Sequence, residues 1–125
     1  MGCLEWLTSD PNDPLLKDNR SGIRAFFIGE GIFRTVVLNT LSVNLVIMTM
    51  PDLGNYYIKR SASGVHYMYL FHSMVSTHMI YRKGAFDHFD SILCVGKHHI
   101  EEIREWESLN KLPAKQLFNH GYGVL

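Results

Sequence analysis

Four short apolar runs recur along the chain, and none of them alternates cleanly between apolar and polar positions. They cover Ala25 to Ile28, Leu45 to Met48, Tyr67 to Phe71 and Ile92 to Val95. Strands that are covered on both faces have this continuous apolar pattern, and such strands are typical of parallel sheets. We therefore expect the four runs to lie in one parallel sheet, with a short fifth strand within Lys115 to Gly123.

Three segments carry the spacing or the boundary residues of helices. A short helix from Pro14 to about Lys17 is predicted after the N-cap residue Asp13. Apolar residues recur at helical spacing between Glu30 and Thr40, and the clearest helix runs from Lys97 to about Lys111. The apolar stripe expected for this last helix consists of Ile100, Ile103, Trp106 and Leu109.

Strands that alternate with helices indicate the α/β class. The expected architecture is a Rossmann-like parallel sheet with helices on both faces. A chain of 125 residues with 46% hydrophobic and 19% charged residues has the size and composition of one globular domain. Residues 1–125 are therefore expected to form a single Rossmann-like domain.

Composition and charge exclude several classes of function. Twelve basic and twelve acidic side chains cancel, so no broad basic face for nucleic acid is predicted. The longest apolar run, Leu41 to Met50, is too short to cross a bilayer as a helix, and the N-terminus lacks the pattern of a secretory signal. We expect a cytoplasmic protein in which Cys94 is a buried, reduced thiol.

The residues that follow the predicted strands are the candidates for chemistry. In open parallel sheets, ligands bind in the crevice beyond the carboxyl ends of the strands. That rule selects Gly29 and Glu30 after the first run, His72 and Ser73 after the third, and His98 after the fourth. Gly29, Glu30, Ser73 and His98 are therefore the predicted substrate-binding residues.

His72 is the candidate catalytic residue. It follows the run "YMYLF" directly, and an imidazole with an ordinary pKa near 6.5 can take a proton from a hydroxyl group at cytosolic pH. The alternative is a structural histidine whose ring nitrogens satisfy backbone groups of the turn.

The other histidines of this region carry weaker signals. His98 and His99 follow Gly96 at a helix start, where free N–H groups favour an anion such as phosphate, although both also suit a purely structural helix entry. His78 and His88 lie in predicted loop sequence, and no acidic or thiol side chain stands at a spacing that completes a zinc site with them. We predict no metal and no cofactor.

Three segments together resemble a known family. The stretches "FHSMVS", "FDHFDSILCVGKHHIEEI" and "HGYGVL" follow the order of elements in the CDP-glycerol glycerophosphotransferase family, and more broadly in glycosyltransferases with two facing Rossmann-like domains (GT-B). In that family a strand ends in a histidine motif of the type HGTP; here His72 takes the histidine position and the motif is "HSMV".

The resemblance implies an N-terminal, acceptor-side half of a GT-B-type enzyme, encoded as a fragment or first domain of a longer chain. The full enzyme would transfer a glycosyl or glycerophosphate unit from a nucleotide-activated donor to a polymer or lipid-linked acceptor in cell-wall or surface-polysaccharide synthesis. It would lie in the cytoplasm, peripherally at the membrane, and the isolated chain would be inactive. The alternatives are half of another GT-B relative, such as a nucleotide-sugar epimerase, and a binding module without catalysis.

Overall fold

The computed structural model describes residues 4–18, 22–51, 53–54, 59–71 and 83–121. The elements follow the chain in the order β1 (Glu5–Thr8), η1 (Pro14–Leu16), β2 (Arg24–Phe27), α1 (Gly31–Asn39), β3 (Leu45–Met48), β4 (His66–Leu70), β5 (Ser91–Cys94), α3 (Lys97–Asn110) and β6 (Gln116–Asn119). The expected helices begin and end within two residues of their predicted bounds. The carboxylate of Asp13 accepts a hydrogen bond from the N–H of Leu15 at 3.0 Å, as an N-cap does.

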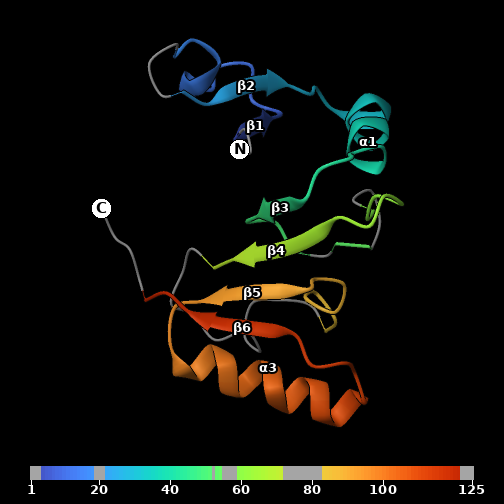
Figure 1. The fold of residues 1–125 in the computed structure, drawn as a ribbon, viewed down its shortest axis with the longest axis vertical. Helices are drawn as coiled ribbons and strands as arrows, with labels where there is room; N and C mark the ends of the chain where they lie inside the picture. Colours follow the sequence, from blue (N-terminus) through green and yellow to red (C-terminus); the bar gives the residue numbers. More distant parts are fainter. Residues whose placement is uncertain (1–3, 19–21, 52, 55–58, 72–82, 122–125) are drawn as a thin grey trace.

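Four strands form one parallel sheet in the order β3-β4-β5-β6, with every neighbouring pair parallel (Figure 1). The connections between parallel strands must cross from one end of the sheet to the other, and α3 makes this crossing between β5 and β6. The prediction of an α/β fold with a Rossmann-like parallel sheet is confirmed.

The position predicted for the first apolar run is wrong. β2 does not join the four-stranded sheet but pairs in parallel with β1, in a separate two-stranded sheet. Phe26 and Phe27, which the pattern predicts to be covered on both faces, are both exposed. A continuous apolar run identifies a strand, but its pairing partner depends on contacts far away in the sequence.

The core lies on one face of the four-stranded sheet. The parallel register places Val46, Tyr67 and Ile92 on the same face. Tyr69 on this face is fully buried, and its ring contacts Phe71, Phe86 and Phe89 at centroid distances of 4.9 to 5.3 Å. Ile103 of α3 belongs to the same cluster. These contacts fix α3 against β5 and β6, as Figure 1 shows.

The buried stripe of α3 differs from the predicted one. Its buried residues are His99, Ile103 and Glu107, spaced four apart, whereas Leu109 is 73% exposed. The polar members of this stripe have partners in the structure, which is why a search for apolar residues alone misplaces it.

Cys94 is a fully buried free thiol, as predicted. Burial raises its pKa to about 11, because the interior disfavours the thiolate. Within the part of the chain that the structure describes, no helix is long and apolar enough to cross a membrane.

Candidate functional site

The carboxyl ends of β4, β5 and β6 meet at one edge of the sheet. The N–H of Phe71 donates to the carbonyl of Leu93 at 3.2 Å, and the N–H of His120 donates to the carbonyl of Cys94 at 2.9 Å. These bonds continue the pairing one residue beyond β4 and β6. The residues that follow the three strands are thereby held side by side, at the edge where parallel sheets bind ligands.

His99, in the first turn of α3, packs against Phe71, the residue that follows β4. Its side chain is fully buried, and its ring lies 4.1 Å from the ring of Phe71 and 4.2 Å from that of His98 (centroid to centroid). A fully buried imidazole in an aromatic cluster supports the fold around it and is shielded from a ligand in the crevice. Among the two alternatives for His99, its burial therefore favours the structural one.

His98 lies partly exposed at the same edge, folded over Gly96. A Cβ atom built on Gly96 would lie 3.0 Å from Nδ1 of His98, so a larger residue would push the ring away. Nε2 of His98 is buried and has no hydrogen-bond partner in the described part of the chain. Nε2 is enclosed in this arrangement, so a ligand in the crevice would reach it only after the imidazole ring turns.

The start of α3 is favourable for an anion. Gly96 is the N-cap residue and supplies no side-chain hydrogen bond, and the first turn of α3 contains no acidic residue. The first N–H groups of a helix have no partner within the helix, and the helix dipole is positive at this end. The chemistry available here is the binding of a phosphate or carboxylate group by backbone N–H groups with an imidazole beside them.

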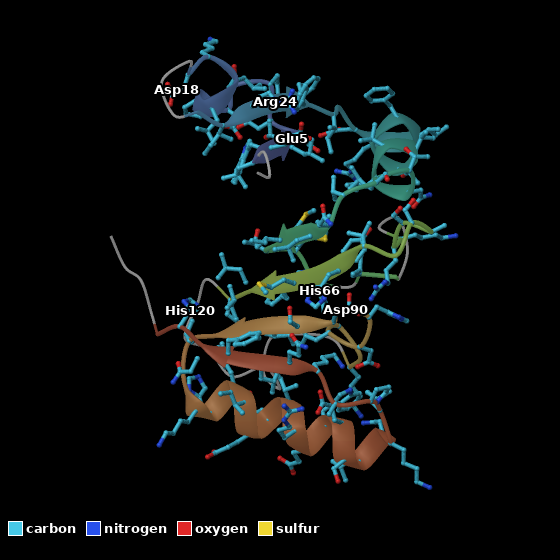
Figure 2. All side chains as sticks on the ribbon, viewed as in Figure 1. Glu5, Asp18, Arg24, His66, Asp90 and His120 are labelled. Carbon is cyan, nitrogen blue, oxygen red and sulfur yellow. The ribbon has the colours of Figure 1, made fainter. Side chains whose placement is uncertain are left out.

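His120 is a site candidate that the sequence reasoning missed. It directly follows β6 and is exposed at the same edge (Figure 2). The rule that selected His98 would also have selected His120 if the fifth strand had been bounded at Asn119.

Gly29 and Glu30 lie at the end of β2 and therefore in the other sheet. In Figure 1 the arrow of β2 points toward α1, whereas the arrows of β3 to β6 point to the opposite side. Gly29 adopts a φ of 65°, which favours glycine, and Glu30 is the N-cap residue of α1 without a side-chain cap. The structure thus does not gather these two residues with His98.

His72, Ser73 and His78 lie outside the described residues. Their predicted roles therefore stay predictions. The described residue that precedes His72 is Phe71, which is buried at the end of β4. His88 is described, and it lies on the amino side of β5 with an exposed side chain.

The amino edge of the sheet holds a hollow of about 250 Å³. Its lining is Arg60, Asp87, His88, Phe89, Asp90, Pro113, Ala114 and Lys115. The guanidinium of Arg60 donates to both carboxylate oxygens of Asp90, at 2.9 and 3.1 Å, and to the carbonyls of Val65 and His88. Figure 2 shows Asp90 at the end of the sheet opposite to His120. These contacts join three loops, so we interpret this edge as structural.

Asp90 is held in its charged form. Partial burial pushes its pKa upward, but the hydrogen bonds from Arg60 and from the N–H of Tyr67 outweigh burial and leave the pKa below its ordinary value of 3.8. A carboxyl group whose pKa is lowered by folding stabilises the folded state above that ordinary value. This contribution is lost as the pH falls through the lowered pKa.

We expect Arg60→Ala to lower the free energy of unfolding by about 2 kcal/mol, because it removes charge-assisted hydrogen bonds to Asp90 and to two carbonyls. Both side chains are 35% exposed, so solvent screening keeps the effect below that of a buried pair. Arg24→Ala, which breaks an exposed ion pair with Glu5, should cost less than about 0.5 kcal/mol. Urea denaturation at neutral pH measures both, and equal losses would contradict the assignment.

Among the described residues, no three histidine, cysteine or acidic side chains are grouped so that they could hold a metal ion. Comparison of the chain with protein-family models, with curated proteins and with solved structures gives no significant match. The interpretation of the site therefore depends on its own geometry.

Proposed function

We propose that this chain is the acceptor-side, N-terminal half of a transferase that uses a nucleotide-activated donor. The donor would be CDP-glycerol or a nucleotide sugar, and the acceptor a polymer or lipid-linked chain of a cell wall or surface polysaccharide. The enzyme would act in the cytoplasm, peripherally at the membrane. The observation that carries the proposal is the uncapped first turn of α3, which lies with His98 at the carboxyl edge of a parallel sheet.

The size of the site indicates which part of the substrates it would bind. Backbone N–H groups of one helix turn and a single imidazole suffice to hold one phosphate group. They do not surround a nucleoside, which needs a concave pocket that buries most of its surface. In the proposed enzyme this edge binds the phosphate or acceptor portion, and a second domain binds the nucleotide.

The isolated chain should therefore bind CDP-glycerol or a UDP-sugar weakly and show no turnover. We expect a dissociation constant near millimolar, or roughly −4 kcal/mol, in an NMR titration. The amide signals that shift should be those of residues 96–99 and 120, and His98→Ala should weaken the binding. Amides next to Arg60 and Lys115 at the amino edge serve as internal controls.

Two results would contradict the proposal. Micromolar binding would mean that the chain holds a complete nucleotide site by itself. Shifts confined to the amino edge, with none at residues 96–99, would mean that the hollow beside Arg60 is the binding site instead.

A further inference from the structure

Among the described residues, the helix that packs on the four-stranded sheet, α3, lies on one of its two faces only. The core cluster occupies the face that carries Tyr67, Tyr69 and Ile92. The register places six apolar side chains on the other face, namely Leu45, Ile47, Met68, Leu70, Leu93 and Phe118. None of these six belongs to the core cluster, and no described helix packs against them. We call these six residues the open sheet face.

The register also places His66, Ser91 and Gln116 on this side of the sheet, where Nε2 of His66 lies 2.8 Å from Oγ of Ser91, but each of the four strands contributes at least one apolar residue. Leu45, Ile47 and Phe118 on the two edge strands are about half exposed, and the residues between them are partly buried. The residues that the register places on this side of the four strands include no Asp, Glu, Lys or Arg, although edge strands of soluble proteins are commonly protected by charged residues. Parallel sheets are normally covered on both faces by helices. The face therefore has the character of a surface that a helix covers.

α1 has the matching surface. Ile32, Phe33 and Val36 form a stripe along it and are 84%, 63% and 52% exposed. The helix buries none of its residues, and Figure 1 shows it beyond the edge of the sheet at β3. A helix of nine residues is too short to be stable in water on its own, so α1 requires a partner for its apolar stripe.

We propose that two copies of this chain form a dimer in which α1 of each copy covers the open sheet face of the other. One chain carries both complementary surfaces, so a two-fold arrangement satisfies both at once and closes without forming a fibre. From their exposed fractions, the three residues of the stripe together with Leu45, Ile47 and Phe118 present roughly 600 Å², which is of the order of the roughly 800 Å² that each partner of a stable interface buries. The dimer is independent of the proposed transferase function.

Light scattering coupled to size-exclusion chromatography tests the proposal with three variants. Wild type should elute at twice the mass of one chain. Phe33→Glu in the stripe and Ile47→Glu in the open sheet face should each yield monomers at the same concentration. Leu109→Glu changes an equally apolar, 73% exposed residue on α3 outside both surfaces, and it should remain dimeric.

Mixing the two monomeric variants provides a second test. Phe33→Glu keeps an intact face and Ile47→Glu keeps an intact stripe, so their mixture should form a dimer held by one of the two contacts. Circular dichroism verifies that each variant is folded. A monomeric wild type overturns the proposal, as does a Phe33→Glu or Ile47→Glu variant that stays as dimeric as Leu109→Glu.

Discussion

Replacing Glu107 by alanine should lower the free energy of unfolding by about 3 to 5 kcal/mol, the range for breaking a buried ion pair. Glu107 accepts hydrogen bonds from the N–H of Lys115 at 3.0 Å and from Arg104 at 2.8 Å, and its carboxylate lies 3.8 Å from Nζ of Lys115. Both Glu107 and Lys115 are buried. Alanine would leave the ammonium group of Lys115 without its counter-charge and its N–H without an acceptor, and each loss is costly in the interior.

Urea denaturation followed by circular dichroism measures this loss. Glu105→Ala is the matched control, because it makes the same change on an exposed position of the same helix, and it should cost less than about 0.5 kcal/mol. The double variant Glu107→Leu with Lys115→Met should recover part of the stability, since it leaves no unpaired charge in the interior. Arg104 also loses its partner but is 44% exposed and stays solvated, and the N–H of Lys115 still lacks its acceptor. Equal losses for Glu105→Ala and Glu107→Ala would show that the pair contributes little.

The strands of the main sheet could be predicted from the sequence because their signal is local. Leu45 to Met48 and Tyr67 to Phe71 are apolar runs, and β3 and β4 lie within one residue of them. The pairing of β2 with β1 was not predictable in this way. β1 is only four residues long, and its sequence does not indicate which other strand it pairs with.

The buried side of α3 shows a different limit. Hydrophobic periodicity placed Leu109 inward and gave no role to Glu107. Glu107 is buried because Arg104 and Lys115 neutralise it and bond to it, and Lys115 comes from the segment after the helix. A polar side chain can be buried only when it has such partners. The hydrophobic pattern along one helix carries no information about partners that come from other segments.

The candidate site was predictable as an edge but not as a complete set of residues. The position of His98 after a buried strand identified it, whereas His120 was missed because its strand is short and only partly apolar. The pair of Arg60 and Asp90 is separated by 30 residues in the sequence, and it meets only because β4 and β5 are neighbours. Site residues on different strands come together through the topology, so their grouping requires the fold.

In a transferase that contains this chain, His72→Ala should lower kcat by about 10²- to 10⁴-fold, the usual contribution of general-base assistance. His72 follows Phe71, which is buried and bonded to β5 at the carboxyl edge of the sheet. His98 and His120 lie at this same edge of the sheet. A base one residue after Phe71 would therefore follow directly on the proposed site, and its expected role is to take the proton of an acceptor hydroxyl group. The melting temperature should change little, because the expected role is chemical.

His88→Ala is the control for His72→Ala, since His88 is an exposed histidine on the amino side of β5, where no acceptor should bind. It should leave kcat within about twofold of wild type, a difference of less than about 0.5 kcal/mol in activation free energy. The pH dependence of kcat/KM adds a readout that a structural role would not change. The fall of kcat/KM at low pH, which reports protonation of the general base in the free enzyme, should disappear in His72→Ala. A His72→Ala enzyme with normal kcat and a lowered melting temperature would instead assign His72 to the turn after β4, with no part in the chemistry.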